Sequence, residues 1–197
     1  MIGNAQPRKE GLDPDLLIIS ASICSRLSNY VTNKFTNDSQ LCHRVANHIP
    51  LLLWSTTLME SGYRRNRFLR EVGSSEPAML ELILTHGVDP NRSFGGQSEW
   101  HLYLEDIRTP WDGEEREQAF DRIKVMLRYG ANFKQECTVD SPIYGQKRKT
   151  RADELLKEWF DGDQFGVLQD IVKRRERKSK MISKTLRNVQ LWIKSKK

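Results

Sequence analysis

The chain lacks the features that mark secreted and membrane proteins. Its 197 residues include three cysteines, Cys24, Cys42 and Cys137, which are odd in number and far apart. This usage indicates reduced thiols and not a disulfide framework. No apolar run approaches the roughly 18 residues that a membrane-spanning helix needs, and the first residues, MIGNAQPRKEG, contain no apolar signal segment. These absences predict an intracellular protein, either cytoplasmic or nuclear.

The chain also lacks the motifs of common catalytic and metal sites. There is no G-x-x-x-x-G-K-[ST] sequence to hold phosphates, and no C-x-x-C pair or H-E-x-x-H motif for zinc. Cys42, His43 and His48 are close in sequence, but together they supply at most three metal ligands. His101 is expected to bond to Ser98 or to the adjacent turn. We therefore predict no catalytic residue, no metal and no cofactor, and we expect that the protein is not an enzyme.

Positive charge is concentrated at one end of the chain. The sequence carries +6 overall, but eleven of its 32 bases and one of its 26 acids lie within residues 173–197. That segment is therefore +10, and the preceding 172 residues are −4. The apolar residues of the segment recur at i, i+4, i+7 and i+11, which is typical of one face of an amphipathic helix. They are Ile182, Leu186, Val189 and Ile193.

Three interpretations of this basic tail stay open at this point. The tail is a solvated, partly disordered end, or a patch for nuclear import or nucleic acid, or a helix that packs its apolar face on a partner helix or an anionic membrane. Repulsion among the bases at its start is expected to oppose a compact helix there. The candidate binding bases are Lys173, Arg174, Arg175, Arg177, Lys178 and Lys180.

Before the tail, apolar residues recur at helical spacing in four pairs of short helices. An arginine-rich insertion between Gly62 and Pro77 and an acidic insertion over residues 105–118 interrupt the pairs. Thr150 is the expected N-cap of the last pair. Three tryptophans fall at equivalent positions in the first helix of a pair and are predicted to lie in the core: Trp54, Trp100 and Trp159.

The clearest local signal is the junction over residues 80–104. Gly87 can adopt the left-handed conformation that closes the first helix without a Cβ penalty. Ser98 is predicted to cap the next helix by accepting a hydrogen bond from the amide of His101. A similar helix ending recurs at residues 129–132, and Gly130 lies 43 residues after Gly87.

This order of signals resembles the junction between ankyrin repeats. The outer helix of that family ends in Leu-Leu-x-x-Gly-Ala-Asp-Val-Asn, and the next inner helix opens with Gly-x-Thr-Pro-Leu-His. Residues 83–91 match the first pattern, and residues 96–104 match the second with identity at Gly96, His101 and Leu102. The wider order of motifs is similar to the C-terminal, degenerate ankyrin region of fungal NACHT-type NTPases.

The resemblance implies an all-α fold, an ankyrin-like helical repeat array or solenoid of about four degenerate units with insertions, over residues 13–172. Residues 1–12 are expected to be a flexible lead-in, and residues 173–197 the basic tail. Such arrays are protein–protein interaction modules, so a protein partner is expected. A nucleic-acid- or nucleus-associated protein that acts through its tail is the alternative. The candidate partner-binding residues are Asp89, Asn91, Arg92, Phe94 and Trp111.

Overall fold

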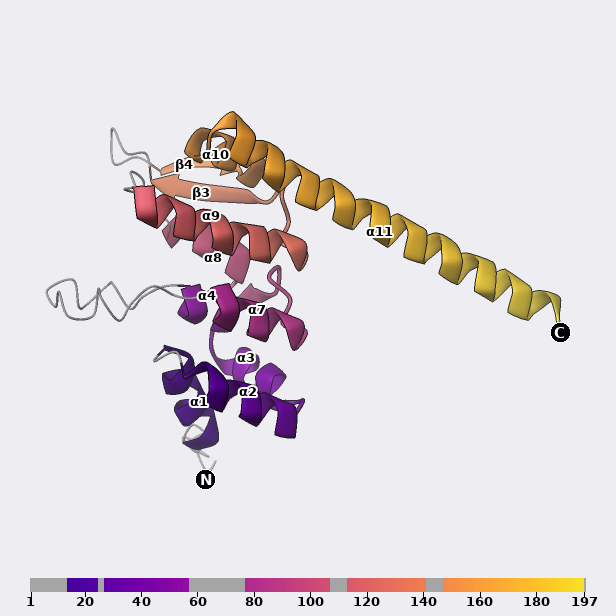
Figure 1. The fold of residues 1–197 in the computed structure, drawn as a ribbon, viewed down its shortest axis with the longest axis horizontal. Coiled ribbons are helices and arrows are strands. Elements are labelled where there is room, and N and C mark those ends of the chain that lie inside the picture. The colour runs from indigo at the N-terminus through magenta and orange to yellow at the C-terminus, as the bar shows by residue number, and fades with distance from the viewer. Residues whose placement is uncertain (1–13, 25–26, 57–76, 107–112, 141–146, 197) are drawn as a thin grey trace, which may run out of the picture.

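The computed structural model describes residues 14–24, 27–56, 77–106, 113–140 and 147–196 (Figure 1). Most of these residues are helical, which confirms the predicted predominance of helix. None of the helices in these ranges combines the length and the apolar character that crossing a bilayer requires. The helices are α1 (Pro14–Cys24), α2 (Ser28–Asn37), α3 (Leu41–His48), α4 (Leu51–Thr56), α7 (Pro77–Thr85), α8 (Glu99–Asp106), α9 (Gly113–Arg128), α10 (Ala152–Trp159) and α11 (Gly162–Ser195).

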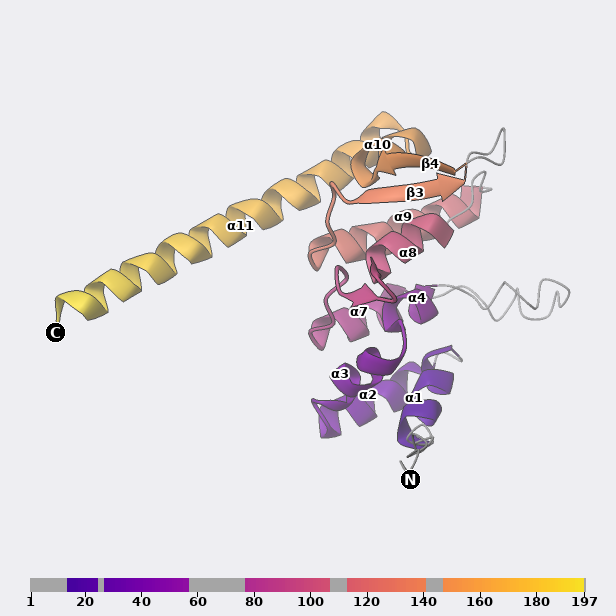
Figure 2. The same ribbon diagram turned by 180° about the vertical axis from the view of Figure 1, so that it is seen from behind.

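The helices lie in layers that follow the order of the chain (Figures 1 and 2). The first layer contains α1, α2 and α3, the next pairs α4 with α7, and the following layer contains α8 and α9. Between layers, α1 contacts α4 and α4 contacts α8, while α2 contacts α7, α7 contacts α9 and α9 contacts α11. One hydrophobic cluster runs through these contacts. Trp100 and Trp159 belong to it, as predicted.

Helix α3 is an element that the sequence analysis did not predict. Its sequence, LCHRVANH, is polar overall. Its few apolar residues nevertheless share one face of the helix and are buried: Leu41, Cys42, Val45 and Ala46. The Asp38 carboxylate accepts hydrogen bonds from the backbone amides of Gln40 (3.0 Å) and Leu41 (3.1 Å), so it satisfies amides at the start of the helix.

Two short antiparallel hairpins also depart from a purely helical chain. Strands β1 (Ser93–Phe94) and β2 (Gln97–Ser98) form the first, and β3 (Glu136–Asp140) and β4 (Lys147–Arg151) form the second. In the second hairpin Glu136 lies opposite Arg151, and Asp140 lies opposite Lys147. Strand β3 packs against α8, and β4 contacts α10. This hairpin therefore lies between α8 and α10 (Figure 2).

Two predicted boundaries are wrong. Thr150 does not cap α10, because it lies in β4 and the cap residue is Arg151. The Glu154 carboxylate instead accepts from the Arg151 amide (3.3 Å) and from the Thr150 hydroxyl (3.2 Å). The predicted insertion over residues 105–118 is also shorter than expected, since α8 continues to Asp106 and α9 begins at Gly113.

Helix α11 is one continuous element of 34 residues. The Asp161 carboxylate caps it by accepting from the Gln164 amide (2.8 Å). The helix continues through the bases after Val172, so the expected repulsion among them does not interrupt it. Its first part packs on the layers below, and its remainder projects away from them (Figure 1). Every side chain from Glu176 to Lys194 is exposed.

Several predictions fall on residues that lie outside the described part of the chain. They are the lead-in over residues 1–12, the whole insertion between Gly62 and Pro77, and Trp111. The structure does not describe the side chains of Cys24 and Trp54 either.

Candidate interaction surfaces

The predicted junction is present as a tight turn after α7. Gly87 has a φ of 87°, and its amide donates to the Leu84 carbonyl (3.0 Å). Gly130, at the end of α9, has a φ of 112° and donates to the Leu127 carbonyl (3.3 Å). Positive φ is the conformation that glycine adopts without strain. Both helix endings predicted from the glycines are therefore confirmed.

The two turns after these glycines are built alike and are bonded to each other. Asp89 accepts from the amide of Asn91 (2.8 Å), and Asn132 accepts from the amide of Lys134 (3.0 Å), which is the same two-residue pattern. The Asn91 side chain then bridges the turns. It donates to the Gly130 carbonyl (2.8 Å) and accepts from the Asn132 amide (2.8 Å). Its amide group thus joins one layer to the next.

The candidate partner-binding residues of this turn therefore make internal contacts. Besides Asp89 and Asn91, the Arg92 guanidinium donates to the Asn47 side chain (2.7 Å). Phe94 is half-buried at the β1–β2 hairpin, followed by two exposed glycines of positive φ. Binding of a partner by these four residues stays a prediction, as it does for Trp111.

The start of α8 combines a predicted cap with a buried acidic side chain that was not predicted. The Ser98 hydroxyl accepts from the His101 amide (3.0 Å), which confirms the cap. Next to it, Glu99 is fully buried and accepts from the backbone amide of Leu52 in α4 (2.7 Å). The Trp100 indole donates to the Asn132 carbonyl (3.0 Å). Glu99 thus connects α8 to the preceding layer, and Trp100 connects it to the turn after α9.

A shallow polar groove lies where the two hairpins meet the start of α8. Its volume is about 300 Å³. Within it, His101 Nε2 lies 3.0 Å from a Glu105 oxygen, and Gln97 donates to the same carboxylate (3.3 Å). Backbone groups and polar side chains form its walls. It is lined by residues 96–98 and 135–138 together with His101 and Lys149.

The two described cysteines have raised pKa values and are poor nucleophiles. Burial, with Glu105 nearby, raises the pKa of Cys137 to about 11. Its thiol donates to the Thr150 carbonyl (3.6 Å), not to the histidine of the groove. Burial and Glu99 raise the pKa of Cys42 to about 12. Thiolate, the reactive form, is therefore scarce at neutral pH. Over the part of the chain that is described, no three His, Cys, Asp or Glu side chains form a metal-binding group.

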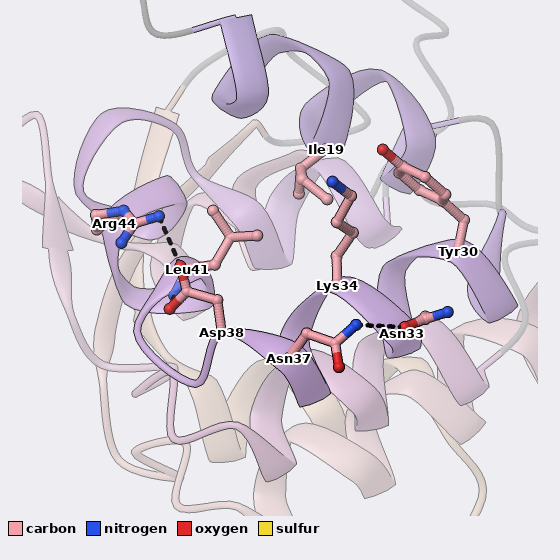
Figure 3. Close-up of a pocket in the computed structure, with 8 residues that line it drawn as sticks. All are labelled: Ile19, Tyr30, Asn33, Lys34, Asn37, Asp38, Leu41 and Arg44. Atoms are coloured by element: carbon pink, nitrogen blue, oxygen red, sulfur yellow. Dashed lines mark hydrogen bonds and ion pairs between the residues drawn. The ribbon is translucent and has the colours of Figure 1, made fainter.

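A second hollow of about 380 Å³ lies on the first layer, between α1, α2 and α3 (Figure 3). Its polar side chains pair with one another: Arg44 lies 2.8 Å from the Asp38 carboxylate, and Asn37 donates to Asn33 (2.7 Å). Desolvation alone would raise the pKa of Asp38. Hydrogen bonds from the Gln40 amide and from Arg44 outweigh it, so the pKa of Asp38 is lowered. These pairs leave a charged, open surface and not an enclosed ligand site.

The candidate bases of the tail have two different surroundings. The Arg175 guanidinium donates to the carbonyls of Leu127 (3.0 Å) and Ala131 (3.2 Å) at the end of α9. A cation at this position also complements the negative end of the helix dipole. Arg175 therefore belongs to the fold. The others are exposed on α11: Lys173, Arg174, Arg177, Lys178 and Lys180.

Comparison with known proteins identified no relative of the chain. No protein-family model matches the chain, and no curated protein or solved structure is significantly similar to it.

Proposed function

We propose that the protein is a non-catalytic protein–protein interaction module built on an ankyrin-like helical array. The observation that carries this proposal is the pair of bonded turns. Equivalent turns follow α7 and α9, and Asn91 bonds one to the next. The pattern of contacts supports it, because the first helices contact one another from α1 through α4 to α8, and the second helices contact one another from α2 through α7 and α9 to α11. Each pair then buries its apolar face only by stacking, as in repeat proteins.

The β3–β4 hairpin distinguishes this array from a regular one. It packs on α8 at the place where the first helix of the next pair would otherwise stack. It also supplies one wall of the polar groove beside His101. We propose that this groove receives an extended segment of the partner, through hydrogen bonds to side chains such as Gln97 and Lys149. Kinship with the C-terminal region of fungal NACHT-type NTPases is part of the same proposal and rests on motif order alone.

The proposal is tested by site-specific photo-crosslinking in the source cells. A crosslinker placed at Lys149, in the groove, is expected to capture a defined partner protein, whereas one placed at Lys157, exposed on α10, is not. The identified partner is then purified and titrated with the full chain. His101→Ala with Gln97→Ala is expected to weaken binding about tenfold, and Lys157→Ala is expected to leave it unchanged. Equal capture at both positions, or an unchanged affinity of the groove variant, contradicts the proposal.

Association with nucleic acid is the second candidate function. The exposed bases of α11 favour it, because no acid follows Glu176. Titration of a DNA duplex with salt distinguishes the two functions. A steep loss of affinity with salt, abolished by deleting residues 178–197, supports nucleic-acid association. Weak binding that the deletion does not change contradicts it.

A further inference from the structure

Helix α11 carries a narrow seam along its whole length. The seam positions follow one another at alternating spacings of four and three residues, the repeat of a coiled-coil contact line. The first positions face the body of the protein, and the later ones are solvent-exposed. In order they are Leu168, Val172, Arg175, Ser179, Ile182, Leu186, Val189 and Ile193.

The exposed part of the seam lies on the same side of α11 as its contact with α9. Leu168 and Val172 are buried there, and Arg175 bonds to the end of α9. Ile182 and Val189 follow Arg175 by 7 and 14 residues. A straight helix drifts by only about 20° per seven residues. Figures 1 and 2 show the angle that α11 makes with the stacked layers. Because the exposed seam continues the side of α11 that contacts α9, we infer that it faces the inner side of this angle.

The apolar side chains of this distal seam are accessible. Ile182 is 60% exposed and Leu186 is 58% exposed, and Val189 and Ile193 are 47% and 48% exposed. The positions that flank the seam are mostly uncharged. They include Ser183, Thr185 and Gln190. Bases occupy the opposite face: Lys180, Lys184, Arg187 and Lys194.

These features narrow the class of occupant. A flat bilayer laid against the seam would meet the stacked layers, because the seam faces them. Nucleic acid would be bound by the basic face and would leave the apolar seam uncovered. A second copy of the same helix would bring two strongly positive segments together, since residues 177–197 contain no acid. An acidic helix fits the seam in width and in polarity, and its charge is opposite to the net charge of residues 177–197. The bases on the opposite face would be about one helix diameter (10–12 Å) away, close to the 10 Å screening length at 0.1 M salt, so their attraction to the acids would be weakened but not removed.

We propose that the distal seam of α11 is a docking site for an acidic amphipathic helix of a partner protein. The partner helix would place apolar side chains every three or four residues against Ile182, Leu186, Val189 and Ile193. Its acids would interact, at longer range, with the bases on the opposite face of α11. This site is separate from the polar groove, so an experiment can contradict one of the two proposals and leave the other unaffected.

The test uses the full chain and a 28-residue synthetic peptide with Leu at the seam positions of four heptads and Glu elsewhere on its polar faces. Fluorescence anisotropy measures the affinity. Leu186→Gln is expected to weaken binding at least tenfold. The matched control is Leu191→Gln, because Leu191 is 59% exposed, the same residue type, and on the opposite face of the same helix. It is expected to change the affinity less than twofold.

Further outcomes decide the proposal. A peptide with Ala at the seam positions and the same glutamates is expected to bind at least tenfold more weakly, and 0.5 M salt is expected to weaken the Leu peptide. Equal effects of the two leucine variants would show non-specific adhesion and overturn the proposal. Two further results would overturn the proposal if the peptide does not bind. One is attachment of the chain to vesicles of neutral and anionic phospholipid (7:3) that Leu186→Gln abolishes. The other is a dimer of the free chain, seen in sedimentation, that the same variant dissociates.

Discussion

At the scale of single residues, the structure is held by polar groups that join one layer to another. Asn91 connects two turns, Glu99 reaches from α8 to α4, and Arg175 reaches from α11 to α9. The sequence predicted the local role of Ser98 and Gly87, because a cap and a left-handed glycine act within a few residues. It could not predict these three longer contacts, because each partner lies 39 to 48 residues away.

Glu99 is expected to be the most sensitive of these positions. Glu99→Ala removes a buried acceptor and leaves the Leu52 amide without it, which costs about 1–3 kcal/mol. Urea unfolding measures the loss. The control is Glu117→Ala, an exposed acid on α9, for which we expect a change within about 0.5 kcal/mol. Similar midpoints for the two variants would show that the buried carboxylate does not support the fold.

Gly87 gives a second prediction at this scale. Its φ is 87°, and an added Cβ would lie 3.3 Å from His43. Gly87→Ala is therefore expected to cost about 1–2 kcal/mol, the usual penalty of an L-residue in the left-handed region. Gly162→Ala, where nothing lies within 4 Å of the added carbon, is the comparison, and thermal unfolding is the measurement. If Gly87→Ala unfolds no earlier than Gly162→Ala, the turn is not strained by a side chain.

At the scale of elements, helical periodicity predicted α1, α2, α7 and the end of α9, where apolar residues mark one face. The β3–β4 hairpin escaped prediction for a physical reason. Strand β4 reads KRKTR, without an apolar residue, and it forms by pairing with β3, in which Cys137 and Val139 are buried. The start of the tail was misjudged because local repulsion was weighed without the packing of Val172 and Arg175.

The two parts of α11 are expected to differ in their effect on stability. Deleting residues 178–197 removes exposed side chains and keeps Arg175, so the melting temperature should change by less than about 2 °C. Deleting residues 175–197 also removes the guanidinium that bonds to two carbonyls of the α9 end, and a loss of about 1 kcal/mol should lower it by about 2–4 °C. Circular dichroism follows both transitions. A large drop for the shorter deletion would place the distal helix within the folded unit.

At the scale of the whole molecule, stability is expected to be distributed by layer. Neighbouring elements contact each other, so damage in the last layer should spread only gradually toward the first. Trp159→Ala tests this, because Trp159 is a buried residue of α10 and its truncation should cost about 3–5 kcal/mol. Hydrogen exchange should accelerate first in α10 and the β3–β4 hairpin and last in α2 and α3.

The matched control for this experiment is Trp192→Ala, which truncates the same residue type at a site 63% exposed. It should leave the protection of all layers unchanged. A uniform loss of protection in the Trp159 variant would mean that the layers unfold as one cooperative unit. That result would contradict the proposed ankyrin-like array, in which each layer is stabilised mainly by its neighbours.

Because α11 is uninterrupted, its length sets how far its C-terminal end lies from the stacked layers. At about 1.5 Å per residue, the twenty residues from Glu176 to Ser195 extend about 30 Å beyond the last contact with α9. The helix thus acts as a spacer of fixed length and direction, unlike a flexible tether, whose end would sample a wide volume. A molecule bound at its far end would be held clear of the groove. One partner could occupy both surfaces only by spanning that gap, and two smaller partners could bind at once without touching.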